Sequence, residues 1–176
     1  MSDQTYYKVV DHDMKACHGG DYTYRMNRWT RRIADTVECG RGYHICTAEQ
    51  LAPWLYADNR GCIVLTVEAE GVTDAGDKCV AERIKPVRKV VLDVVDIHWL
   101  ATEAAITCLH STDDESVQYS IQTVREWCFG LGAGLKAAES AAWSAARSAA
   151  ESAARSAAWS AIGRIYADYI EGVTDE

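Results

Sequence analysis

The chain has 176 residues, a hydrophobic content of 48% and a formal net charge of −8, which leaves room for one domain or two small ones. Residues 1–92 carry 13 basic and 13 acidic side chains, whereas residues 93–176 carry 5 and 13, so the second half holds the whole excess of negative charge. This balance argues against a broad basic face for nucleic acid and favours a small molecule or a protein as partner.

The seven cysteines are odd in number, irregularly spaced and without a CxxC pair, and the first residues show no signal-peptide pattern. We therefore expect reduced, mostly buried thiols in a cytoplasmic protein. Cys17, His18, His44 and Cys46 could together approach a zinc ion, but their spacing matches no standard zinc module, so we predict no metal site.

Hydrophobic patterning predicts a β-rich first half. The segments expected to be strands are 5–10, 21–26, 43–46, 61–68, 78–84 and 87–95. Pro86 predicts a turn between the last two of them. Together these segments indicate a small mixed sheet with one or two helices.

Arginines alternate with aromatic residues between residues 22 and 32. A guanidinium fork suits an oxyanion and an aromatic face suits a base, so this composition is typical of a site for a phosphate and a stacked ring. The candidate ligand-binding residues here are Arg25, Trp29, Arg31 and Arg32. The alternative is a solvated segment whose tryptophan packs onto the core.

A glycine turn, a short strand and a helix start follow one another in residues 39–56. Thr47 with Gln50 three residues later forms a capping-box pattern, which predicts a helix through residue 55, although Pro53 could shorten or kink it. Tyr43 and His44 on the preceding strand are the remaining candidate ligand-binding residues, because a helix N-terminus beside them would favour an anion. His44 also fits an ordinary structural histidine.

The second half is predicted to be helical. Helices are expected over residues 96–109 and 112–129, followed by a long helix over residues 135–170 that contains the Ser-Ala-Ala-x repeat of residues 140–160. Gly163 is a possible break in that helix. The predicted fold class is therefore α+β, with a small mixed-sheet domain (residues 1–92) followed by an all-α bundle (residues 93–176) whose long, alanine-rich central helix is buried or mediates oligomerisation.

The glycine, aromatic, histidine and Thr-x-x-Gln order of residues 42–50 resembles a segment of ADP-ribosyltransferase-like domains, and residues 77–87 resemble their late Glu-x-Val-Val…Ile-x-Pro segment. That resemblance places Lys8 at the first motif position, Tyr43 or His44 at the second and Asp77 at the third. A lysine replaces the expected His or Arg, and an aspartate replaces the expected Glu. The resemblance thus implies a degenerate domain with a nucleotide-shaped cleft.

A second resemblance spans most of the chain. Residues 42–46, residues 77–84 and the Ala-Ala-Trp-Ser-Ala-Ala-Arg repeat of residues 141–147 are similar to an uncharacterised bacteriophage protein family. It implies a phage accessory protein in the bacterial cytoplasm, and it implies no activity.

Three functions remain open. The first is non-catalytic binding of a nucleotide-derived, possible NAD-like ligand, such as a host defence signal that the protein sequesters, with the helical half for assembly into a homo-oligomer. The second is inhibition of a host enzyme through the acidic helical half. The third is an ADP-ribosyltransferase or glycohydrolase that uses NAD, in which Tyr43 and His44 hold the dinucleotide and Asp77 or Glu82 activates the acceptor. We expect no catalytic residues in the first two cases, and His44 and Asp77 in the third.

Overall fold

The structure, a computed structural model, describes residues 4–16, 22–37, 40–55, 61–97, 99–100, 103, 122 and 155–173. Its elements in chain order are β1 (Tyr6–Val10), β2 (Tyr43–Ile45), the 3-10 helix η1 (Ala52–Trp54), β3 (Cys62–Glu70), β4 (Thr73–Asp74), β5 (Cys79–Ala81), β6 (Arg83–Leu92) and α4 (Arg155–Gly172). Residues 94–97 and 99–100 are also helical.

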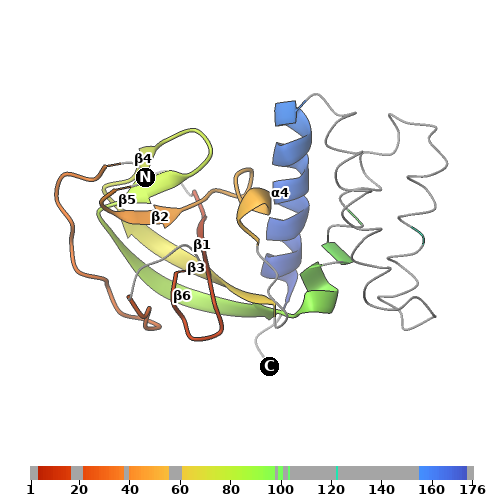
Figure 1. Cartoon of the computed structure of the whole chain (residues 1–176), viewed down its shortest axis with the longest axis horizontal. Coiled ribbons are helices and arrows are strands. Elements are labelled where there is room, and N and C mark those ends of the chain that lie inside the picture. The colour runs from red at the N-terminus through yellow and green to blue at the C-terminus, as the bar shows by residue number, and fades with distance from the viewer. Residues whose placement is uncertain are drawn as a thin grey trace.

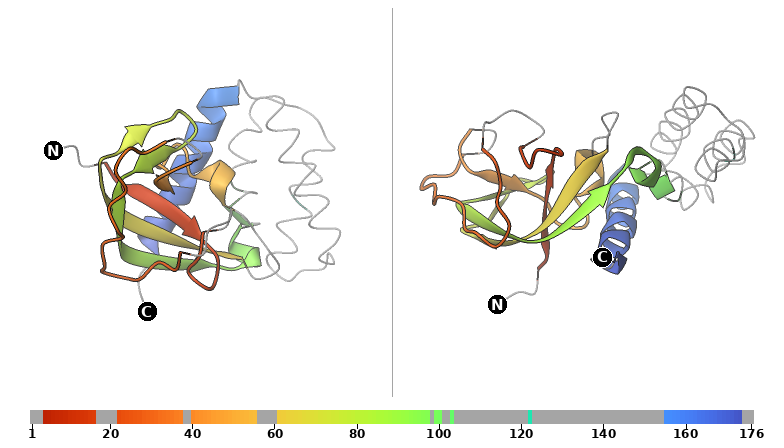
Figure 2. Two further views of the ribbon diagram at one scale, coloured as in Figure 1. Left: turned by 60° about the vertical axis from the view of Figure 1, so that its left-hand side comes forward. Right: turned by 90° about the horizontal axis from the view of Figure 1, so that it is seen from below.

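The strands form two three-stranded antiparallel sheets, in the orders β1-β3-β6 and β2-β5-β4. Figure 2 shows β3 between β1 and β6. The two sheets are joined where Tyr7 and Cys46 exchange both backbone hydrogen bonds, at 2.8 and 2.9 Å. They are also joined through the chain, because β5 runs into β6 across the single residue Glu82.

Alternation along the strands sorts side chains between two cores, because successive residues of a strand point to opposite faces. The first core lies between the β1-β3-β6 sheet and α4 (Figure 1), and its buried members are Tyr7, Val9, Cys46, Leu51, Cys62, Val64, Val90, Leu92, Leu100, Tyr166, Ala167 and Ile170. The second lies on the other face of that sheet, and its buried members are Val10, Tyr24, Tyr43, Ile45, Ile63, Leu65, Val67, Cys79, Ala81 and Ile84.

The predicted fold class is wrong on two points. Every strand pair in the described residues is antiparallel, so the sheet is not mixed. In the part of the chain that the structure describes, there is no all-α bundle with a long central helix: η1 is a single turn, and α4 spans 18 residues and packs on the sheet. Alanine content predicted helix formation correctly for residues 155–170, but it does not specify which surface the helix packs against.

Three apolar side chains of α4 determine that the helix packs against the β1-β3-β6 sheet. Tyr166 and Ala167 each lie about one helical turn before Ile170, and all three are buried against the sheet. Burying one isoleucine side chain contributes about 1.5–3 kcal/mol. The predicted helix over residues 112–129 and the part of the long helix before residue 155 lie outside the described residues, apart from Gln122, which is helical.

Three local predictions also fail for physical reasons. Pro86 lies inside β6 and does not end it, since β6 is at the edge of the sheet and its outer side does not require a proline N–H. Gln50 accepts a hydrogen bond from the Thr47 backbone N–H at 3.1 Å, as the capping box predicts, but only a turn and η1 follow because Pro53 interrupts the helix. Residues 22–26 form an isolated bridge at Thr23 and no strand.

Polar contacts fasten α4 along its length. The Tyr7 hydroxyl donates to the Glu171 carboxylate at 2.6 Å, and Arg88 donates to the carbonyl oxygens of Glu171 and Val173 at the helix end. Nearer the start of α4, Gly163 lies so close to the turn after β2 that a Cβ atom built on it would overlap the Ala48 carbonyl oxygen. Gly163 therefore does not break the helix but permits its close approach to the turn after β2.

Among the described helices, none is long and apolar enough to cross a membrane.

We expect the substitution Gly163→Ala to destabilise the protein. The added methyl group would meet backbone atoms of Ala48 and Glu49, which can move away only if α4 shifts. Overpacking of this kind costs about 1–3 kcal/mol, more than the ~1 kcal/mol that alanine gains over glycine in a helix. Urea unfolding should therefore show a lower free energy of unfolding.

Gly172→Ala is the matched control, since no described atom lies within 4 Å of a Cβ at this last residue of α4. Its free energy of unfolding should stay the same or rise slightly. Equal effects of the two substitutions would contradict the close contact at Gly163.

Candidate functional site

Residues 27–33, here called the strap, cover the outer edge of β6. The backbone N–H groups of Asn27, Thr30 and Ile33 donate to the carbonyl oxygens of Pro86, Ile84 and Glu82, at 2.7, 2.8 and 2.9 Å. Three strap residues therefore run alongside two residues of the strand. Two strand residues span about 6.6 Å, so the strap advances roughly 2.2 Å per residue. The strap is thus more contracted than a strand, and its orientation repeats every third residue.

This period sorts the strap side chains into three rows. The row that faces β6 includes Thr30, which is buried and whose hydroxyl accepts from the Ile84 N–H at 3.0 Å. The second row, Trp29 and Arg32, lies over charged side chains of β3 and β6. The third row, Arg28 and Arg31, is turned away from both β6 and these charged side chains, and both residues are exposed.

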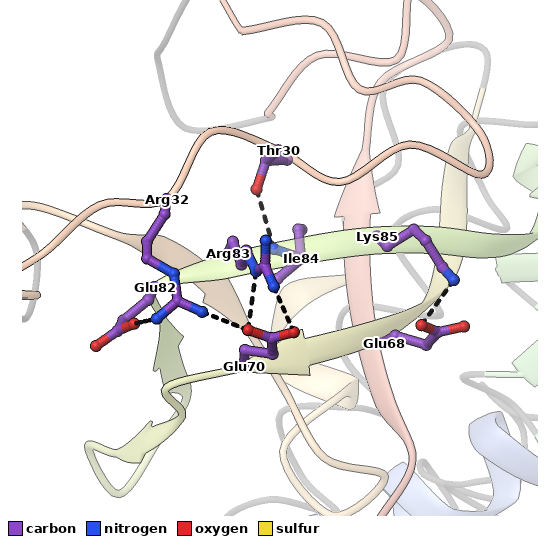
Figure 3. A network of polar contacts seen from close by, with 8 residues as sticks. All are labelled: Thr30, Arg32, Glu68, Glu70, Glu82, Arg83, Ile84 and Lys85. Carbon is purple, nitrogen blue, oxygen red and sulfur yellow. Dashed lines mark hydrogen bonds and ion pairs between the residues drawn. The ribbon is translucent and has the colours of Figure 1, made fainter.

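Arg32 and five charged side chains of the sheet region are here called the charge network (Figure 3), which comprises a linked group of four, Arg32, Glu70, Glu82 and Arg83, and the separate pair of Glu68 and Lys85. Arg32 bridges Glu70 and Glu82, at 2.5 and 2.7 Å. Arg83 binds both oxygens of Glu70 at 2.7 and 2.9 Å. The network contains three cations and three anions, so its charges balance.

Glu70 is the centre of this network, because it receives both guanidinium groups. The hydrogen bonds from Arg83, followed by the charges of Arg83 and Arg32, hold the pKa of the Glu70 carboxyl below its ordinary value. The predicted ligand residue Arg32 is consequently engaged in holding the strap to the sheet.

Trp29 is held flat against this network. Its ring lies over the Arg83 guanidinium at 4.5 Å and over the Lys85 ammonium at 5.6 Å, both within the range of cation–π attraction. The side chain nevertheless remains 36% exposed. Cations thus fix the ring while part of its surface stays open to solvent.

Three tyrosines form an edge-to-face cluster beside the strap. The centroid of the Tyr22 ring is 5.0 Å from that of Tyr24 and 5.8 Å from that of Tyr43. Tyr43 is buried, and its hydroxyl donates to the Arg31 carbonyl oxygen at 2.9 Å. Burial, with the neighbouring tyrosines, raises the pKa of Tyr24. Tyr22 is 42% exposed and lies near Arg25, whose charge partly offsets the rise in the Tyr22 pKa caused by burial.

Three cations in or next to the strap have no counter-ion among the described residues. Arg25, Arg28 and Arg31 are exposed, and no carboxylate of the described residues pairs with them. Arg25 and Arg28 lie between Tyr22 and Trp29 in the sequence, and Arg31 follows Trp29; both rings are exposed. We name Arg25, Arg28 and Arg31 the free arginines, and sequence reasoning had not separated them from Arg32.

The structure separates the two candidates on β2. Tyr43 pairs with Ala81 and points into the second core, while His44 pairs with Val80 and points to the opposite face of the sheet. A ligand on one face therefore cannot contact both side chains.

The three motif positions of the transferase resemblance do not converge. Lys8 and Tyr43 both lie near the Tyr24 ring, at 5.7 and 6.4 Å. Asp77 lies beyond the opposite end of β5, where its carbonyl accepts from the Trp54 indole and its carboxylate pairs with Lys78 at 3.1 Å. The Asp77 side chain is 63% exposed.

Gln50 is a structural residue that the sequence suggested only as a cap. Its amide donates to the Asp74 carboxylate and the Gly76 carbonyl, at 3.2 and 2.9 Å, and its oxygen accepts from Thr47. It thereby ties the turn after β2 to the β4–β5 turn.

Within the described ranges, no group of three or more His, Cys, Asp or Glu side chains could hold a metal ion, and Cys17 and His18 lie outside those ranges. Cys46, Cys62 and Cys79 are buried. Burial raises the pKa of Cys46 to about 12, so this thiol is unsuited to act as a nucleophile.

We expect Glu70→Gln to reduce stability in a pH-dependent manner. Because the pKa of Glu70 is depressed in the folded state, its contribution is present above the unfolded value of 4.5 and is lost as the pH falls through the lower folded value. In urea unfolding, the free energies of unfolding of the variant and the natural protein should differ at pH 7 and converge as the pH falls through the lowered pKa of Glu70.

Glu68→Gln is the matched control, since Glu68 pairs with Lys85 alone and is half exposed. Its effect at pH 7 should be smaller, as for an exposed single pair. If Glu70→Gln lowered the free energy of unfolding by the same amount at pH 3 and pH 7, the central role of this carboxylate would be contradicted.

Residues 4–98 match the family model described as Domain of unknown function (DUF7666). The matched region contains every strand, the strap and the charge network. Comparisons with curated proteins and with solved structures found no match. Because the family model covers more than half of the 176 residues, the chain belongs to the DUF7666 family.

Proposed function

We propose that the protein binds a nucleotide-derived small molecule on the strap and does not transform it. A single observation carries this proposal: the free arginines have no ion-pair partner among the described residues, and they alternate in the sequence with the exposed rings of Tyr22 and Trp29. Uncompensated guanidinium groups favour a phosphate, and a partly exposed ring favours a base.

Rigidity supports the proposal. The backbone of the strap is fixed by three hydrogen bonds to β6 and its neighbouring residue, and Arg32 adds two ion pairs. A site that is already ordered loses little conformational entropy when it binds a ligand. The strap therefore offers the arginines and Trp29 to a ligand from a prearranged backbone.

Binding is favoured over catalysis by the positions of the candidate catalytic groups. His44 and Tyr43 point to opposite faces, and Asp77 lies at the far end of β5 from Tyr43. Glu82, the other candidate for activating an acceptor, is paired with Arg32 at 2.7 Å. These residues do not form one constellation around a reacting atom, as general acid–base catalysis requires.

The roles of the predicted ligand residues follow from their surroundings. Arg31 and Arg25, with Arg28 in addition, would contact phosphate, and Trp29 would stack on the base. Arg32 and Tyr43 act on the ligand indirectly, since the first holds the strap and the second holds the Arg31 backbone. A binder of this kind acts in the cell by sequestering its ligand.

We expect Arg31→Ala to weaken ligand binding at least tenfold, because one charge-assisted contact to phosphate is lost. The measurement is native mass spectrometry of protein purified from bacterial cells, followed by calorimetric titration with AMP and NAD. Lys89→Ala removes one positive charge from an exposed position on β6 outside the strap, and it should leave both affinities unchanged.

An apo mass in all preparations, together with no heat of binding for AMP or NAD, would refute the proposed function. Equal weakening by Arg31→Ala and Lys89→Ala would refute the assignment of the site to the strap, since only overall charge would then matter.

A further inference from the structure

The spacing of the exposed arginines is set by β6. Arg28 and Arg31 are one strap period apart, and one period accompanies two residues of the strand. Their backbone positions are therefore separated by about 6.6 Å along the edge of the sheet. Since the strap is hydrogen-bonded before, between and after them, this separation cannot adjust to the ligand.

From this spacing we infer that the ligand is a short oligonucleotide of two or three units, with one phosphate at Arg28 and the next at Arg31. The inference rests on the proposed function and specifies its ligand class. Neighbouring phosphates of an oligonucleotide are separated by a whole ribose, so each can receive the two parallel hydrogen bonds of its own guanidinium fork. A protein of this kind reads the backbone of the ligand at two fixed points.

A nucleoside diphosphate fits this arrangement less well. Its two phosphates share one bridging oxygen and present their charge at one place, so both guanidinium groups would have to converge on it. Convergence brings two like charges together and costs side-chain entropy in two long residues. The row that faces solvent contains no acidic residue that would offset this repulsion.

The bases have defined neighbours in this arrangement. Trp29 lies between Arg28 and Arg31 in the sequence and points to the side of the charge network, with part of its ring open. A base attached between two bound phosphates can stack on it, as aromatic side chains do in sites for single-stranded nucleic acid. The balanced charge network beneath the ring limits the positive region to the free arginines, which suits a ligand of a few units only.

The test is calorimetric titration of the full chain with three probes: ADP, the 5′-phosphorylated dinucleotide pApA, and ApA. ADP and pApA carry the same formal charge, but only pApA has its phosphates separated by a ribose. ApA has both bases and a single phosphate. We expect pApA to bind at least tenfold more tightly than either of the other two. Arg28→Ala and Arg31→Ala should each reduce the affinity for pApA to that for ADP, and Lys89→Ala should not change it.

The outcomes distinguish this inference from the proposed function. Equal affinities for ADP and pApA would overturn the inference and leave nucleotide binding intact. Equal affinities for ApA and pApA would also overturn it, because the second base and not the second phosphate would then be recognised. No binding of any probe, or of AMP and NAD, would overturn both. The thermal unfolding midpoint of each variant serves as the folding control. Because Arg28 and Arg31 are exposed, replacing either by alanine should leave this midpoint unchanged.

Discussion

The outer edge of β6 is the constraint on which the candidate site depends. An edge strand presents unpaired backbone groups, and proteins commonly cover or interrupt such edges. Here the strap covers the first part of β6 with hydrogen bonds to Glu82, Ile84 and Pro86, and the proline itself removes one donor from that edge. Because three strap residues match two strand residues, the same hydrogen bonds that close the edge also decide which side chains face inward, which lie over the network and which face solvent.

Charge balance then divides the cations of the region into two groups. Arg32, Arg83 and Lys85 are each paired with a glutamate, so they stabilise the strap and fix the Trp29 ring. The free arginines have no such partners among the described residues. A chain with an overall charge of −8 thus presents a small, localised positive region, and a small anionic ligand is compatible with both observations.

Sequence reasoning could predict what depends on local pattern. The apolar runs of β1 and β3 and the alternation of Tyr43 and Ile45 correspond to strands in the structure, and the arginine–aromatic composition marked the strap region. It could not predict what depends on partners distant in the chain. Pro86 is tolerated because β6 is at the edge of the sheet, α4 packs on the sheet because of Tyr166 and Ile170, and Arg32 is engaged because of Glu70 and Glu82. The ADP-ribosyltransferase-like resemblance depends on short motifs whose third position, Asp77, lies away from the other two.

The position of α4 has a consequence for how the chain can vary. The first core is built from the family-matched strands and from Leu100, Tyr166, Ala167 and Ile170, which lie beyond residue 98. Leu100 and Ile162, which are far apart in the sequence, therefore lie in the same cluster of side chains. The two ends of the segment that carries most of the Ser-Ala-Ala-x repeat are thus fixed on one core. A change in the number of repeat units would therefore have to leave these two anchor points side by side.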